Sequence, residues 1–128
     1  MHGDSAPTCD GCSKKAGSKK RLTICRLPDI LVIFLKRFTV NGGKNERRVP
    51  VEAQLTLSDR QYALTSCVFH SGQNNDGHYM TLNKETAEGG GGWTLFNDHK
   101  IFPAMPDNEV NDLLSPGAYI VFYRALHQ

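Results

Sequence analysis

The sequence has 128 residues, of which 39% are hydrophobic and 22% charged, and its formal net charge is +2 with neutral histidines. This size suits one domain or one lobe of a larger one, and with this hydrophobic fraction the chain can bury a core and need not be disordered. The net charge is too small to indicate a nucleic-acid partner by itself. No apolar run approaches the roughly 20 residues that span a bilayer, and no signal peptide is recognisable. We therefore expect no membrane association and an intracellular protein of the cytoplasm, the nucleus or both.

Residues 1–21 are polar and carry a cluster of basic side chains between positions 14 and 21. This composition predicts a loop or finger that is separate from the β-rich body expected over residues 22–128. A run of charge is usually a solvated surface, and no aromatic side chains are interleaved with it to stack on bases. We expect no nucleic-acid partner.

Cys9 and Cys12 are two residues apart, and Gly11 between them permits a tight turn. This is the spacing of a zinc knuckle, but a tetrahedral zinc site needs two further ligands. Cys25 and Cys67 lie in strand-like segments without this spacing. The pair therefore predicts either half of a structural zinc site or a pair of thiols in a loop without metal.

The rest of the chain predicts strands joined by turns. Ile30–Leu35 is continuously apolar and rich in branched residues, which predicts a strand buried on both faces. A turn is expected over residues 40–44, and imperfect alternation over residues 49–57 predicts short strands. A mostly buried strand is expected over residues 62–69.

The next expected strand begins at His78, with His78, Met80 and Leu82 on one face. A flexible glycine-rich loop is expected over residues 84–92, then a strand over 93–98, a helix over 107–114 and a final strand over 118–123. The predicted fold class is α+β, predominantly antiparallel β with one short helix.

Gly77 and His78 stand together at the entrance of one of these strands. Glycine allows close backbone approach or a positive φ, and histidine exchanges protons near neutral pH. The pair suits a site where a slim substrate passes beside a base. The alternative is a turn glycine followed by an ordinary histidine.

Asn97 and Asp98 end the strand that begins at Trp93. A histidine base needs a third group that accepts a hydrogen bond from its other ring nitrogen, and an Asn or Asp at a neighbouring strand end can do this. The alternative is a strand-ending turn, because Asn-Asp is common in turns.

In order, the chain carries "CDGC", "LPDILVIFLKRF", "YALTSCVFHSGQNNDGHYM", "WTLFNDHK" and "AYIVFY". This ordered set resembles the C-terminal half of the catalytic domain of the ubiquitin-specific proteases, which are cysteine-dependent deubiquitinases. The resemblance implies the palm-like lobe of a papain-like cysteine protease fold with part of a finger. It also implies removal of ubiquitin by isopeptide hydrolysis.

The resemblance implies a role for each matching position. His78 matches the general base, Asn97 the third member of the triad and Asp98 a position that assists the site. Gly77 and Tyr79 match the box that flanks the bound tail of ubiquitin. Cys9 and Cys12 resemble the second pair of a four-cysteine zinc site.

No cysteine in the sequence matches the family's nucleophile box. We therefore expect Cys25 and Cys67 to be buried core thiols and the nucleophile to come from an N-terminal half of the catalytic domain. The chain is then a fragment, one part of a split enzyme, or a catalytically inactive module that binds ubiquitin or a ubiquitin-like protein. In the first two cases this chain alone is expected to be inactive.

Overall fold

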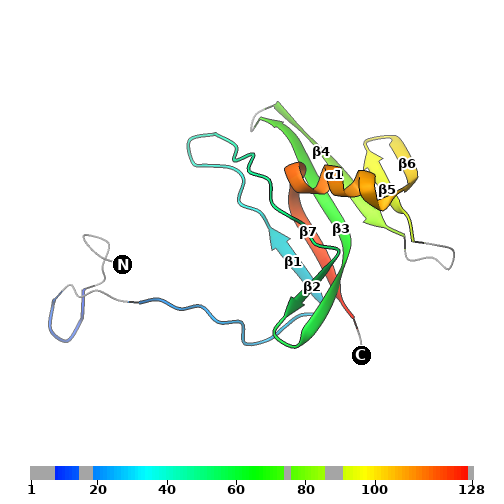
Figure 1. The fold of residues 1–128 in the computed structure, drawn as a ribbon. Helices are drawn as coiled ribbons and strands as arrows, with labels where there is room; N and C mark the ends of the chain where they lie inside the picture. The colour runs from blue at the N-terminus through cyan, green and yellow to red at the C-terminus, as the bar shows by residue number, and fades with distance from the viewer. Residues whose placement is uncertain (1–7, 15–18, 74–75, 86–90, 127–128) are drawn as a thin grey trace.

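The computed structural model describes residues 8–14, 19–73, 76–85 and 91–126, which form one antiparallel sheet and one helix (Figure 1). The elements are β1 (Ile30–Phe34), β2 (Gln54–Leu57), β3 (Arg60–Gln73), β4 (Asp76–Lys84), β5 (Trp93–Asn97), β6 (Lys100–Met105), α1 (Asp107–Gly117) and β7 (Ala118–Ala125). The fold class predicted from the sequence is confirmed.

The strands follow the order β1-β7-β3-β4-β5-β6, and β2 pairs with the beginning of β3. Strands β3 to β6 are neighbours in sequence as well as in space, whereas β7 returns from the helix to lie between β1 and β3. The long strand β3 therefore lies near the centre of the sheet, between β7 and β4.

Helix α1 packs on one face of this sheet, which we call the helix-side face and which carries Phe69, Met80 and Leu95 (Figure 1). The indole Nε1 of Trp93 donates a hydrogen bond of 2.9 Å to Asp107 Oδ1 in the first turn of the helix. The core forms where buried side chains of this face meet the helix. Its members are Tyr62, Leu64, Cys67, Phe69, Leu82, Trp93, Val110, Leu114, Ala118, Val121, Tyr123 and Ala125.

The opposite face, which we call the open face, is aromatic near the end of β3. His70, Tyr79 and Tyr119 pack together there with Phe38 and Phe34, at ring separations of 4.7 to 6.4 Å. Within the described residues no helix covers this face. Its partly exposed rings are available to a partner or to another part of the protein.

The prediction that the first strand is buried on both faces is wrong. β1 is an edge strand, and its side chains alternate between exposed and half-buried. Ile30, Val32 and Phe34 are about half exposed. A continuous apolar run does not show whether a strand is covered on both faces or on one face only.

Other boundaries also differ from the predicted ones. A strand forms at Gln54–Leu57, but the segment around Val49 and Val51 is irregular. The strand expected over residues 62–69 extends to Gln73, and the strand expected from His78 begins at Asp76, so that β3 and β4 pair as a hairpin. The strand β6 was not predicted, because Pro103 interrupts its pattern.

Several expectations fall on parts of the chain outside the described residues. These are residues 1–7 and 15–18 of the expected finger and residues 86–90 of the glycine-rich loop. In the part of the chain that is described, no helix has the length and apolar character needed to cross a bilayer.

Candidate active site

The side chains of His78 and Asn97 meet at the end of strands β4 and β5. His78 Nε2 lies 2.6 Å from Asn97 Oδ1, so that the ring N–H donates to the amide oxygen. The two residues are distant in sequence but were predicted to be neighbours, and the structure brings them together. This is the geometry of a histidine whose tautomer and direction are fixed by a second side chain.

The register of β4 and β5 explains why the side chains of His78 and Asn97 lie close together. β4 and β5 pair through Leu82↔Leu95 and Thr81↔Phe96. Continuing this register by one step places Asn97 opposite Met80, on the helix-side face shared by His78. Asn97 is thus the diagonal neighbour of His78 across the strands, a separation that long side chains can bridge.

Asp98 occupies the turn between β5 and β6 and has a φ of 52°. Asparagine and aspartate tolerate this left-handed conformation better than most residues. The turn holds Asp98 Oδ2 at 3.8 Å from His78 Nε2, and both side chains are partly exposed. The sequence-predicted catalytic set of His78, Asn97 and Asp98 therefore forms one cluster, with Asp98 as its outer member.

The pairing of Nε2 with Asn97 leaves Nδ1 of the neutral imidazole as the ring atom with a free lone pair. The His78 side chain is 43% exposed. A base at the surface of the chain can accept a proton from a group that another segment or partner places beside it.

Gly77 lies next to His78 in the β3–β4 hairpin and pairs with Gly72. Gly72 has a φ of +87°, and a Cβ at that position would meet Asp76 O at 2.5 Å and Gly77 Cα at 3.1 Å. The close backbone contact in this hairpin is therefore between β3 and β4 themselves. The role of Gly77 beside a substrate stays a prediction.

Tyr79 points to the open face, on the other side of β4 from His78. Its ring lies 4.7 Å from that of His70, which in turn contacts Phe38. His70 was not among the predicted site residues, and its Nδ1 is buried without a hydrogen-bond partner among the described residues. No local motif marks it, because its neighbours come from distant segments.

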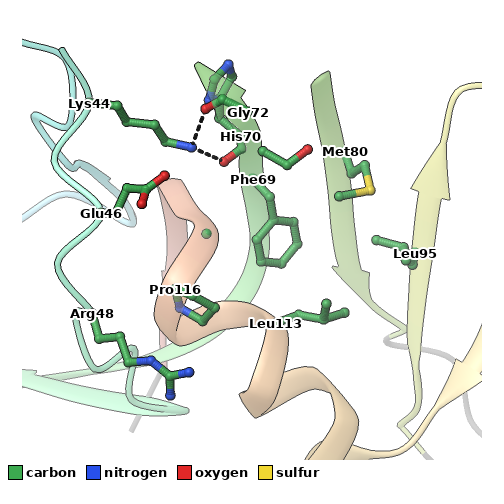
Figure 2. A pocket seen from close by; sticks show the side chains of 12 residues that line it. Lys44, Glu46, Arg48, Phe69, His70, Gly72, Met80, Leu95, Leu113 and Pro116 are labelled. Carbon is green, nitrogen blue, oxygen red and sulfur yellow. Dashed lines mark hydrogen bonds between the residues drawn. The ribbon is translucent and has the colours of Figure 1, made fainter. Parts of the chain in front are cut away.

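A cavity of about 420 Å³ lies on the helix-side face, next to the β3–β4 hairpin (Figure 2). Its apolar wall includes Phe69, Met80, Leu95 and Leu113, and its rim carries Lys44, Glu46 and Arg48. Met80 and Leu95 each stand two positions from His78 and Asn97 along the same strands. This cavity is lined by Gly72 of the hairpin and not by Gly77.

The described cysteines lie away from His78. Burial raises the pKa of the Cys67 thiol to about 12, against smaller opposing effects of the Tyr119 backbone and the Arg37 charge. Cys25 is exposed, contrary to the expectation of a buried thiol. It lines a shallow pocket with Ser58 and Arg60, about 35 Å along β3 from the residue that pairs with His78, given a rise of ~3.3 Å per residue.

Cys9 and Cys12 share one exposed turn, closed by a 2.7 Å hydrogen bond from Ser13 N to Cys9 O. Hydrogen bonds from the backbone of Gly11 and Cys12, and then from the Cys12 side chain, lower the pKa of the Cys9 thiol. Such N–H donors favour the thiolate that a metal requires. Within the described residues no third His, Cys, Asp or Glu joins the pair, so these two thiols do not by themselves complete a tetrahedral zinc site.

Comparison with known proteins identifies the family of this chain. The family model described as ubiquitin carboxyl-terminal hydrolase matches residues 3–123. Ubiquitin carboxyl-terminal hydrolase 21 of Homo sapiens is 30% identical over 141 residues, covering 100% of this chain and 23% of that protein. Ubiquitin carboxyl-terminal hydrolase Usp2 of Drosophila melanogaster is 31% identical over 135 residues, covering 96% and 14%. The chain thus spans less than a quarter of these relatives.

Solved structures agree in fold. A yeast SAGA DUB module matches with a TM-score of 0.79 and 30% identity over 97% of this chain and 29% of that chain. A SAGA DUB module containing Ubp8 and bound to monoubiquitin matches with a TM-score of 0.75 and 31% identity over 97% and 29%. The predicted palm-like lobe of a papain-like protease fold is confirmed. The chain belongs to the ubiquitin carboxyl-terminal hydrolase family.

Proposed function

We propose that this chain is the C-terminal portion of the catalytic domain of a cysteine-type deubiquitinase and carries its base but not its nucleophile. The observation that supports this most directly is the 2.6 Å hydrogen bond between His78 Nε2 and Asn97 Oδ1. A protein that only binds has no need for an oriented imidazole with a free ring nitrogen. In a hydrolase the same arrangement has a defined task.

In the proposed reaction, His78 Nδ1 takes the proton of a cysteine thiol supplied by the N-terminal half of the catalytic domain. The thiolate attacks the carbonyl of the last glycine of ubiquitin, and the imidazolium then gives its proton to the departing lysine amine. Water, activated by the same nitrogen, hydrolyses the thioester and regenerates the thiol. Asn97 keeps the ring in one tautomer throughout, and Asp98 adds negative charge near the imidazolium.

The chemistry of the described thiols supports a nucleophile from elsewhere. A thiol with a pKa of about 12 is almost never ionised at neutral pH, so Cys67 is unsuited to attack. Cys25 lies near the far end of β3, and Cys9 and Cys12 lie in the N-terminal turn. None of these positions lies within hydrogen-bond reach of the His78 ring.

The proposed partner is ubiquitin or a ubiquitin-like protein. The family name and the monoubiquitin held by the related Ubp8 module both point to this class. Gly77 and Tyr79 flank the base on the exposed end of β4, where an extended tail of small residues could pass. We propose that these two residues contact the tail.

The turn that holds Cys9 and Cys12 is proposed to contribute two ligands to a structural zinc ion, with the other two from outside this chain. A bound zinc would fix the turn and has no role in the hydrolysis. Removal of zinc with a chelator should therefore destabilise the finger without altering the His78–Asn97 pair.

The decisive experiment uses a ubiquitin derivative with an electrophile at its C-terminus, tested on the full-length protein and on residues 1–128 alone. We expect labelling of the full-length protein only, at a cysteine outside this chain, as located by mass spectrometry. A His78→Ala variant should label far more slowly. Labelling at Cys9, Cys12, Cys25 or Cys67 contradicts the proposal. Ubiquitin binding by the full-length protein without labelling would establish a binding module instead.

A further inference from the structure

The tip of the β3–β4 hairpin extends beyond the strands on both sides of it. We define the hairpin tip as residues 70–73 and 76–80. On one side β7 pairs with β3 only as far as Phe69↔Ala118, and on the other β5 pairs with β4 only as far as Thr81↔Phe96. The tip carries His78, so its position depends on contacts other than the sheet ladder.

Two side chains supply hydrogen bonds at the sides of this tip. On the β5 side, Asn97 accepts from His78. On the β7 side, the ammonium of Lys44 donates to the carbonyls of His70 and Gly72, at 2.9 and 3.0 Å (Figure 2). These are carbonyls at the edge of β3 that β7 no longer reaches. A lysine with three donors can satisfy both at once.

Lys44 is itself held in place. It forms an isolated bridge with Phe38 across a turn closed by Thr39 and Gly43, and the Phe38 ring packs edge-on against His70 at 4.9 Å. Two residues of this turn therefore contact His70: Phe38 packs against its ring on the open face, and Lys44 donates to its carbonyl at the edge of β3. Burial lowers the pKa of the His70 imidazole, and the positive charge of Lys44 lowers it further.

The segment that follows Lys44 is anchored to the interior. The buried guanidinium of Arg37 donates to the carbonyls of Asn45 and Arg47, at 3.1 and 2.9 Å, and to Ala118 O at 2.6 Å. Farther along, Val49 N donates to Ser115 O at 3.1 Å. The lysine thus stands on a segment that is bonded to the helix and to β7.

We propose that Lys44 is a positioning residue, which holds the hairpin tip so that the His78 ring faces both Asn97 and the incoming thiol. This inference rests on the proposed function. Ser71, between the two bonded carbonyls, is the residue that pairs with His78. A displacement of β3 at Ser71 is therefore transmitted directly to the base. Lys44 does not touch the substrate in this proposal, because both of its described hydrogen bonds go to backbone carbonyls.

The test compares Lys44→Met, Lys44→Arg and Arg48→Met in the full-length protein, with a fluorogenic amide of ubiquitin as substrate. Methionine keeps the apolar stem of lysine and removes its donors. Arg48 is a matched control, since it is an exposed cation of the same segment without a described hydrogen bond. Misplacement of about 1 Å at a catalytic group costs up to roughly 100-fold.

We expect Lys44→Met to lower kcat by about 10- to 100-fold with a much smaller change in KM. Lys44→Arg should recover part of the loss, and Arg48→Met should retain the wild-type kcat. All rates are divided by the folded fraction from circular dichroism, so that loss of folding is not read as loss of positioning. Equal kcat values for Lys44→Met and Arg48→Met would overturn the inference.

A second measurement separates positioning from a general structural role. The rate of labelling by the ubiquitin electrophile is compared in wild-type and His78→Ala backgrounds. If Lys44 acts through His78, Lys44→Met slows labelling in the first background and has little further effect in the second. An equal loss in both backgrounds overturns the inference. Absence of activity in the wild-type protein would instead count against the proposed function.

Discussion

The hydrogen bond from His78 to Asn97 lies beyond the last paired residues of β4 and β5. The strands stop pairing at Thr81↔Phe96, and the side chains continue the connection at a separation of 2.6 Å. Asp98 Oδ2 lies 3.8 Å from the same nitrogen, beyond hydrogen-bond distance, and becomes a second acceptor only if it moves closer to the ring. The imidazole therefore has one close partner and one more distant acidic partner.

This arrangement predicts a graded response to substitution in the full-length enzyme. His78→Ala should lower kcat by about 10²- to 10⁴-fold, the usual contribution of general acid–base catalysis. Asn97→Ala should cost less than His78→Ala because Asp98 can still orient the ring. Asn97→Asp should retain more activity than Asn97→Ala, since it keeps an acceptor at the same position.

The double variant Asn97→Ala with Asp98→Ala tests whether Asp98 takes over the role of Asn97 as hydrogen-bond acceptor. If Asp98 orients the ring only when Asn97 is absent, Asp98→Ala costs more in the Asn97→Ala background than in the wild type. The measurement is kcat for hydrolysis of a ubiquitin amide. Additive losses would show that Asp98 does not serve as the second acceptor.

The sequence was informative wherever a local pattern determines the structure. The strands around Ile30, Tyr62, Trp93 and Ala118 and the helix after Pro106 all form where they were predicted, although the helix extends three residues further, to Gly117. The proximity of His78 and Asn97 was also predicted, because the ordered set of motifs resembles a known family. The residues proposed for the site thus came from motif order, whereas their geometry comes from sheet register.

Contacts that join distant segments could not be predicted in this way. The aromatic cluster of His70, Tyr79 and Tyr119 depends on β7 lying beside β3, and the hydrogen bonds of Lys44 depend on where β7 ends. A run of apolar residues likewise gave no sign that one face of β1 stays exposed. Single-segment periodicity contains no information about which neighbours cover a face.

Gly72 is predicted to be the least replaceable of the described glycines. Its φ is +87°, and an added Cβ would meet Asp76 O at 2.5 Å. Gly72→Ala should lower the free energy of unfolding by about 1–3 kcal/mol, because both strain and a backbone clash oppose alanine. Gly91→Ala is a suitable control, since its Cβ would lie at an ordinary 3.5 Å from Glu85 O. Urea unfolding of both variants checks this, and equal midpoints would contradict it.

Arg37 is predicted to contribute strongly to stability, in a way that lysine does not replace. The residue is 3% exposed, and its guanidinium donates to three backbone carbonyls, those of Asn45, Arg47 and Ala118. A lysine ammonium lacks the planar fork that reaches all three, so Arg37→Lys should cost about 2–4 kcal/mol through unpaired buried carbonyls. The neighbouring exposed Lys36→Met should stay within about 0.5 kcal/mol of wild type. Comparable unfolding midpoints for the two variants would refute the assignment.

Cys67 predicts a specific loss of stability at alkaline pH. Burial raises the pKa of its thiol to about 12, whereas a thiol in the unfolded chain titrates near ~8.5. The unfolded state therefore loses this proton first. The stabilisation by the neutral buried thiol is complete below about pH 8.5 and is lost as the pH rises toward 12, by at most about 1.4 kcal/mol per pH unit.

Cys67→Ala removes this titration, so its free energy of unfolding should fall less steeply than that of wild type between about pH 9 and 11. Burial, and then the charges of Glu52 and Cys67, also raise the pKa of the Tyr123 hydroxyl, which keeps some slope at the upper end. Cys25→Ala, at an exposed thiol, should leave the wild-type slope unchanged. Urea unfolding at a series of pH values provides the measurement. Parallel curves for Cys67→Ala and wild type would show that the buried thiol does not control this pH dependence.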